Sequence, residues 1–348
     1  TIEAGATISG LGLAIVADPG GSLNIINNGA VTGSTGLALG SVGGNITYSG
    51  NGSASGGLAA AGLSIFAVSG TIAVGTADTP VIPNFSGFAG LATVSSTVTS
   101  IFLNGGSLSS LGASGLQMQG GDVSATLTGG TTIANAGTAG TGYGIFASSI
   151  ADPTSIASDA NIGGAGSSFA YGIMSEGDDS IALSQTGGTI HAATAGLAAI
   201  STGDDAVSGD TAAGSSISMD DWHVGAGIRV NTQAAAVNVR AAGTISNTQT
   251  GIMVDSVTGA VNVTAAGTIS GTQFGIAAQS AGLVNVAVPG TISALGAGVL
   301  AVGDNITVAV DGEITAGAVG IFAGSGGTHD AQMSVGSGAT VQGTSLAG

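Results

Sequence analysis

The sequence contains no cysteine and no lysine, and its only basic residues are two arginines among 348 residues. With 19 acidic residues, the formal net charge is −17. Nucleic acids and anionic membrane surfaces are bound by clusters of basic side chains, so we expect this chain to bind neither. The absence of cysteine excludes disulfides and thiolate metal sites.

Charged residues, aromatic residues and proline are also scarce, at 6%, 3% and five residues. Glycine does not recur at every third position, which excludes a collagen helix. A mean hydropathy of +0.54 argues against disorder. No run of 18 apolar residues predicts a transmembrane helix. No basic and apolar leader opens the sequence, so we expect a processed or excised segment of a longer protein.

The sequence is instead rich in glycine, with 66 residues. It also contains a short motif, here called the first phrase, that recurs about every 26 residues. The phrase is Gly-Thr-Ile-Ser or a variant, with its apolar residue at Ile8, Val31, Ala54, Phe85, Leu108, Ile133, Ile162, Ile190, Ile217, Ile245, Ile269, Ile292, Ile314 and Val341. A second phrase follows at Gly251-Ile252, Gly275-Ile276, Gly298-Val299 and Gly320-Ile321, and a third at Val237-Asn238-Val239, Val261-Asn262-Val263, Val284-Asn285-Val286 and Ile306-Thr307-Val308.

Each repeat therefore holds three short segments with period-2 alternation, which cannot bury their apolar faces alone. Stacking each repeat on the next as one turn of a coil buries them as ladders of like residues. The sequence predicts a single all-β, right-handed parallel β-helix over residues 1–348, with about 13–14 turns of three short strands. Glycines at the corners are expected to supply bends with positive φ.

At these phrases the sequence resembles the passenger segment of a bacterial autotransporter. The resemblance covers essentially the whole chain, and its motifs are structural. It implies secretion to the outer surface of a Gram-negative cell, often for adhesion or aggregation. The family's signal peptide and C-terminal barrel are not in this sequence, and no Gly-x-Ser-x-Gly stands beside a suitable His and Asp.

Two acidic corners are spaced by one repeat, Gly177-Asp178-Asp179 and Gly203-Asp204-Asp205. Three interpretations remain open: Asx turns that cap tight corners, a Ca²⁺ site made by the four stacked carboxylates, or a carboxylate pair for glycoside hydrolysis. β-helical pectin hydrolases carry a Gly-Asp-Asp turn, but they also need Gly-His-Gly and Arg-Ile-Lys, which this chain lacks. We therefore predict no catalytic residues and no cofactor other than, as a candidate, calcium at Asp178, Asp179, Asp204 and Asp205.

Other unusual residues are few. Trp222 and His223 are a candidate contact with a carbohydrate or protein partner, or else Trp222 folds over a corner. Arg229 and Arg240 belong to one turn, and we expect them to pair with nearby acids such as Asp220 or Asp221. The residue after the second-phrase Ile is expected to point outward or to pack at a corner; these residues are Phe66, Phe146, Met174, Met253 and Phe322.

The charge is distributed unevenly along the chain. Residues 1–121 form nearly uncharged turns with only Glu3, Asp18 and Asp78, whereas residues 122–348 form acidic turns. An uncharged surface tolerates packing against another surface. Three function classes follow: a non-enzymatic structural or adhesive protein of a bacterial surface, a self-assembling filament subunit, and, as a remote alternative, a polysaccharide hydrolase or lyase. The expected partner is a second copy, packed laterally or end to end, or a ligand on a host or cell surface.

Overall fold

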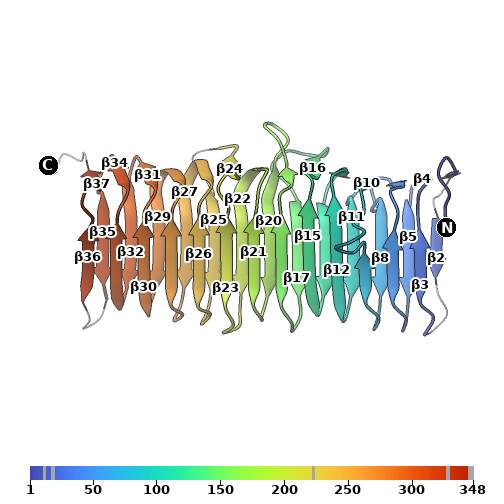
Figure 1. Ribbon diagram of the computed structural model, residues 1–348, viewed down its shortest axis with the longest axis horizontal. Coiled ribbons are helices and arrows are strands. Elements are labelled where there is room, and N and C mark those ends of the chain that lie inside the picture. The colour runs from blue at the N-terminus through green and yellow to red at the C-terminus, as the bar shows by residue number, and fades with distance from the viewer. Residues whose placement is uncertain (11–12, 17–19, 222–223, 327–329, 344–348) are drawn as a thin grey trace. The chain divides into compact units, whose positions relative to one another are not determined.

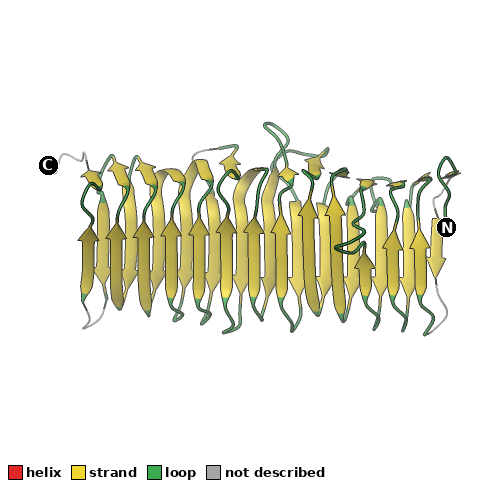
Figure 2. Ribbon diagram, in the orientation of Figure 1, coloured by secondary structure: helices red, strands yellow, loops and turns green. Residues whose placement is uncertain are grey.

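A computed structural model describes residues 1–10, 13–16, 20–221, 224–326 and 330–343, and they form strands and loops without a helix (Figures 1 and 2). The chain divides into unit 1, Thr1–Glu176, and unit 2, Gly177–Gly348. Each unit is a right-handed parallel β-solenoid, and together they contain about 13 turns. The predicted fold class is confirmed. That the units form one continuous coil stays a prediction.

In unit 1, strands with the same place in successive turns pair in parallel (Figure 1). The first strands are β1 (Thr7–Gly10), β4 (Ala30–Gly33), β7 (Ser53–Ser55), β10 (Asn84–Gly87), β13 (Ser107–Ser110), β16 (Thr132–Asn135) and β19 (Asn161–Ile162). The second are β2 (Leu13–Val16), β5 (Leu37–Ser41), β8 (Leu63–Ala67), β11 (Leu91–Ser95), β14 (Ser114–Gly120), β17 (Tyr143–Ser149) and β20 (Phe169–Gly177). The third are β3 (Leu23–Ile26), β6 (Ile46–Ser49), β9 (Ile72–Val74), β12 (Val98–Asn104), β15 (Asp122–Thr128) and β18 (Thr154–Ser158).

Unit 2 repeats this arrangement, but three of its turns fuse the first and second strands into one long strand. First, second and fused strands are β22 (Thr189–Ser201), β24 (Ser216–Met219), β25 (Ala226–Thr232), β27 (Thr244–Ser256), β29 (Thr268–Ser280), β31 (Thr291–Ala294), β32 (Ala297–Gly303), β34 (Glu313–Ala316), β35 (Ile321–Ser325) and β37 (Thr340–Gly343). Third strands are β21 (Ile181–Gln185), β23 (Val207–Thr211), β26 (Val237–Ala241), β28 (Val261–Ala265), β30 (Leu283–Val288), β33 (Asn305–Val310) and β36 (Ala331–Val335).

The first-phrase ladder has the predicted register within each unit. In unit 1, Ile8 pairs with Val31 and the ladder continues to Ile162, including the Ala54–Phe85 step. In unit 2 it runs from Ile190 to Val341. Ile245 and Ile269 are fully buried, while Thr268, which directly precedes Ile269, is exposed. Alternation therefore assigns the two faces correctly.

The fused strands correct the prediction of three separate short strands. In β27, the corner between the first and second phrases is a bend within the strand. Asn247 there has a φ of 55° and is the one non-glycine residue with positive φ in the described part of the chain. Asparagine adopts the left-handed region more readily than most residues, so the strand turns without losing its pairing partner. The register with β29 shifts at this bend, between Ile245 and Thr250.

The second-phrase glycines have a different role from the one predicted. Corner glycines such as Gly188 and Gly214 do have positive φ, but Gly251, Gly275 and Gly298 do not. A Cβ atom on Gly275 would overlap Cγ2 of Ile292, the first-phrase residue of the next turn. The same overlap recurs at other pairs, among them Gly115–Ile133, Gly144–Ile162, Gly196–Ile217, Gly227–Ile245, Gly251–Ile269 and Gly298–Ile314. These glycines are needed because the core ladder approaches their backbone closely.

Candidate functional site

The two acidic corners lie one on the other in unit 2, as their spacing predicts. A Cβ atom on Gly203 would overlap the carbonyl oxygen of Asp178. Asp178, Asp204 and Asp205 are exposed, and Asp179 is half-buried with its Oδ1 accepting a hydrogen bond from the Ser180 backbone N–H at 2.6 Å. An Asx turn bonds the side chain to the backbone two residues on, whereas this contact is to the next residue, so the Asx-turn interpretation also stays a prediction. Among the described residues, no three His, Cys, Asp or Glu side chains come together in a group that could hold a metal ion, so calcium here stays a prediction.

Trp222 and His223 lie outside the described residues, and their role as a partner contact stays a prediction. The structure shows an acidic neighbour of Arg240. Its register partner on the preceding turn is Asp210, on β23, and a pairing of the arginines with Asp220 or Asp221 stays a prediction. Partial burial raises the pKa of the Asp210 carboxyl, while the backbone N–H and the charge of Arg240 act to lower it. Period-2 alternation along β23 and β26 already places both side chains outward, so the register alone would have found this pair.

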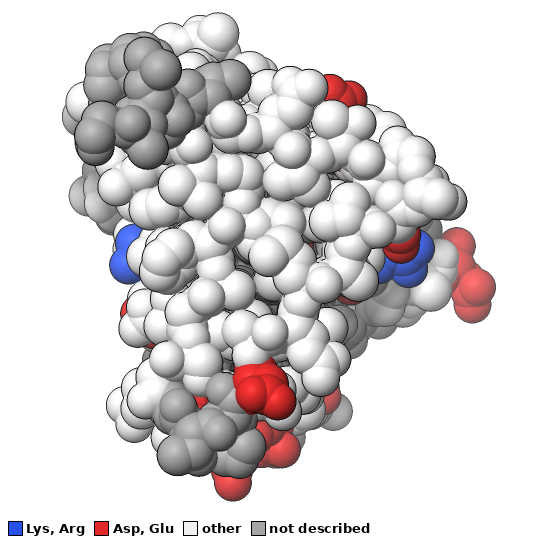
Figure 3. Space-filling model, turned by 90° about the vertical axis from the view of Figure 1, so that its left-hand side faces the viewer, with Lys and Arg blue, Asp and Glu red and all other residues white. Residues whose placement is uncertain are grey.

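The residues after the second-phrase Ile behave as alternation predicts in most turns. Phe66 and Phe322 are exposed, and Phe146 and Met253 are half-buried. Met174 is the exception, since it is buried beside Phe146, its register partner. Figure 3 shows that most of the surface seen along that view carries no charged side chain and that the acids form small separate groups.

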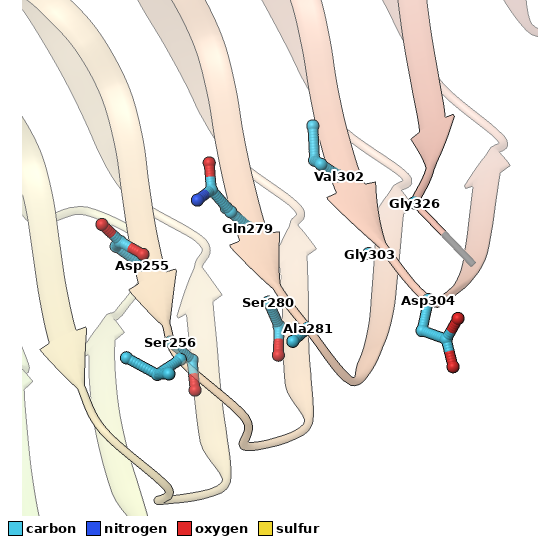
Figure 4. Close-up of a pocket in the computed structure, with 10 residues that line it drawn as sticks. Asp255, Ser256, Gln279, Ser280, Ala281, Val302, Gly303, Asp304 and Gly326 are labelled. Atoms are coloured by element: carbon cyan, nitrogen blue, oxygen red, sulfur yellow. The ribbon is translucent and has the colours of Figure 1, made fainter.

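The structure also contains a groove that the sequence did not indicate. It lies in unit 2, where the second strands end and the chain turns toward the third strands, and encloses a cavity of about 470 Å³. We call it the corner groove. Its lining residues are Asp255, Ser256, Val257, Gln279, Ser280, Ala281, Val302, Gly303, Asp304 and Gly326 (Figure 4).

Two ranks of outward side chains lead into the corner groove from β27, β29 and β32. The polar rank contains Asp255 and Gln279, which are exposed register neighbours, and it ends at Val302. In Figure 4 these three side chains point to the same side of their ribbons, and Ser256 and Ser280 point to the other. The second rank contains Met253, Ala277 and Leu300, around a smaller hollow of about 60 Å³ that also borders Asp255 and Gln279.

The groove's serines are engaged in holding the corner. Ser280 Oγ donates to the Gly259 carbonyl at 2.6 Å and accepts from the Gly282 N–H at 2.9 Å. Ser256 Oγ accepts from the Gly259 N–H at 3.0 Å. Backbone groups of the turn thus find partners in the absence of a regular ladder. The serines stabilise the groove's floor, whereas the side chains of Asp255 and Gln279 are exposed along its lining.

Outside the groove, the outward faces carry ladders of uncharged polar residues. On β26, β28 and β30, Asn262 Nδ2 donates to Asn238 Oδ1 at 3.2 Å, and Asn285 Nδ2 donates to Asn262 Oδ1 at 2.9 Å. In unit 1, Ser86 Oγ donates to Ser55 Oγ at 3.1 Å between neighbouring turns. On an outward face of each unit, similar short side chains therefore stack at the spacing of the turns, about 4.8 Å.

No protein-family model, no curated protein and no solved structure matches this chain. The described residues form no helix that could cross a membrane. The similarity to autotransporter passengers consequently rests on the sequence phrases alone.

Proposed function

We propose that this chain is a non-enzymatic structural and adhesive protein of a Gram-negative cell surface, similar to an autotransporter passenger. The observation that carries the proposal is the regular array of uncharged polar ladders on a parallel solenoid, exemplified by Asn238, Asn262 and Asn285. Covering such a surface avoids the large desolvation cost of burying charges. Its many donors and acceptors can pair with polar groups of a partner.

The test is to display the chain on the surface of a non-adhesive Gram-negative strain and measure attachment to host cells and settling of the culture. We expect attachment or settling to exceed that of the same strain displaying an unrelated β-solenoid. Equal behaviour of the two strains would contradict the proposal. Release of reducing ends from polysaccharides by the purified chain would instead favour the hydrolase or lyase alternative.

Self-assembly into a filament is the second candidate, and a specific surface of unit 1 favours it. Leu58, Phe88 and Leu111 lie exposed at corners of successive turns, and Phe88 reaches over Gly112 of the next turn. They belong to the nearly uncharged residues 1–121, where a second copy would meet little repulsion. We expect association to increase with salt and near the isoelectric point, about pH 4.1.

Lysines at outward positions of unit 1 test this second candidate. Thr32 and Thr47 are both exposed. Thr32→Lys with Thr47→Lys should reduce light scattering at high salt if copies pack laterally through unit 1. A chain that stays monomeric at high salt and at pH 4 would contradict self-assembly.

A further inference from the structure

In the corner groove, two unlike ranks of outward side chains run side by side along the stacking direction. Asp255 and Gln279 form the polar rank, and Met253, Ala277 and Leu300 form the apolar rank. Successive members of a rank are one strand spacing apart, about 4.8 Å. A ligand lying across the strands would therefore meet apolar surface along one edge and hydrogen-bonding groups along the other.

The surface of the apolar rank is hollowed rather than flat. Ala277 stands between the longer Met253 and Leu300, which leaves the hollow between them. One strand further, Phe322 pairs with Leu300 and is half exposed, and its ring lies over Gly324, the register partner of Val302. The ring therefore lies close to the end of the polar rank.

The polar rank presents the exposed carboxylate of Asp255 and the exposed amide of Gln279 to a ligand. Asn231 is the register neighbour of Asp255 on the preceding turn, and its Oδ1 is buried with no hydrogen-bond partner among the described residues. Because this oxygen is buried, a ligand in the groove does not contact it, and the groups of the rank that a ligand can reach are those of Asp255 and Gln279. Gln279 supplies both an amide donor and an acceptor on the other side of Asp255.

Charge and chemistry narrow the choice of ligand. The net charge of −17 and the carboxylates of Asp255 and Asp304 disfavour an anion. The described residues contain no group of three ionisable ligands for a metal ion. A sugar ring presents apolar C–H faces together with hydroxyl donors and acceptors, which matches the two ranks. In an extended chain of hexoses, one sugar unit advances by a distance comparable with one turn of the solenoid.

We propose that the corner groove binds a neutral oligosaccharide whose hexose units lie along the stacking direction, with their apolar faces over Ala277 and their hydroxyl groups at Asp255 and Gln279. This inference rests on the proposed adhesive function and names the ligand class of one adhesive site. The cavity of about 470 Å³ is of the size that holds a small-molecule ligand.

Titration calorimetry of the purified chain tests the inference. The neutral probes are cellohexaose, mannohexaose and N-acetylchitohexaose, the acidic probe is hexagalacturonate, and the cationic probe is oligolysine. We expect saturable binding of at least one neutral probe and none of hexagalacturonate. Ala277→Trp should abolish binding because it fills the hollow, and Gln279→Ala should weaken binding about tenfold because it removes hydrogen bonds.

Ala157→Trp is the matched control, since Ala157 is a half-buried outward alanine on β18, away from the corner groove. It should leave the affinity within about twofold, and thermal melting should show that both tryptophan variants are folded. The inference is overturned if no neutral probe binds, if only oligolysine binds, or if Ala277→Trp and Ala157→Trp have equal effects. Attachment of displaying cells is measured in parallel: adhesion without oligosaccharide binding overturns this inference alone, and loss of both overturns the proposed function too.

Discussion

Asn27 Nδ2 donates a hydrogen bond to the hydroxyl oxygen of Tyr48, 3.1 Å away, in the interior of unit 1. Both residues are fully buried. Asn27 Oδ1 accepts from the Gly29 N–H at 3.1 Å, and the Tyr48 ring meets that of Phe85 edge-on, with centroids 5.9 Å apart. The hydrogen bond joins Tyr48, on the third strand β6, to Asn27, which lies in the corner between β3 and β4.

This pair predicts a loss of stability at alkaline pH. Burial raises the pKa of Tyr48 from 10.0 to about 12, against a smaller opposing effect of Asn27. The folded state therefore holds the phenol proton more tightly than the unfolded state. Its contribution to stability is fully present below pH 10 and is lost as the pH rises through 12, amounting to about 2 kcal/mol by pH 11.5.

Urea unfolding of wild type and Tyr48→Phe between pH 8 and 11.5 measures this effect. At pH 8 the variant should be less stable by about 1–2 kcal/mol, because Asn27 loses a hydrogen-bond acceptor. The difference should shrink or reverse by pH 11.5. A difference that stays constant with pH would contradict the assignment.

Gly275→Ala should destabilise unit 2 by about 1–3 kcal/mol, since the new methyl group would overlap Cγ2 of Ile292. Combining it with Ile292→Ala should cost less than the sum of the two single changes. The control is Gly326→Ala, because a Cβ atom there has no neighbour within 4 Å. Chemical denaturation measures the free energy of unfolding of the wild type, the two single variants, the double variant and the Gly326→Ala control. If the destabilisation of the double variant equals the sum of the two single effects, the close approach of Ile292 is not the reason that position 275 needs glycine.

Ile269→Asp should prevent cooperative folding of unit 2, because it places an unpaired charge in a fully buried ladder. Thr268→Asp, one residue earlier and exposed, should shift the melting temperature only slightly. Thermal unfolding followed by circular dichroism compares the two variants. Similar melting of both would mean that the inward and outward faces are misassigned.

The carboxyl group of Asp210, beside Arg240, predicts that folding stability changes with pH in the acid range. Since burial raises the pKa of Asp210, the carboxyl's favourable contribution is present below its unfolded pKa and is lost as the pH rises through its folded pKa. Asp210→Asn should therefore stabilise the fold at pH 7 and have a smaller effect at pH 3. Arg240→Gln should destabilise it at pH 7 and raise the pKa of Asp210 further, as NMR titration of the carboxyl would show.

If the acidic corners are Asx turns, calcium addition and EDTA should change the melting temperature by no more than about 1 °C, because the carboxylates then bind no ion. Scanning calorimetry of the wild type gives the measurement. A larger rise with calcium that disappears in Asp178→Asn with Asp204→Asn would establish the calcium site instead.

The recurrent phrases were sufficient to predict the ladder from Ile8 to Ile162 and that from Ile190 to Val341, since a buried strand tolerates only one register. They also placed Thr268 outward. The fusion of first and second strands in β27 was not predicted, because it depends on Asn247 taking a conformation that asparagine visits only at particular sites.

The corner groove could not be found from composition or from single residues. It depends on Ala277 standing between Met253 and Leu300, three residues separated by more than 20 positions each in sequence. Such a small residue between larger ones becomes meaningful only when the register is known. The same is true of Asp210 beside Arg240, where proximity in sequence pointed to Asp220 and Asp221.

The fit of Gly275 beneath Ile292 bears on how the gene could change in length. The glycine of one turn is matched to an isoleucine of the following turn, and the same pair recurs as Gly251–Ile269 and Gly298–Ile314. Because this glycine–isoleucine contact is the same between each of these pairs of turns, one complete repeat can be lost or duplicated, and the turns that become neighbours will still pack together. Unequal recombination at whole-repeat boundaries would then change the number of turns without creating a faulty junction, whereas insertions of other lengths would be confined to the corners.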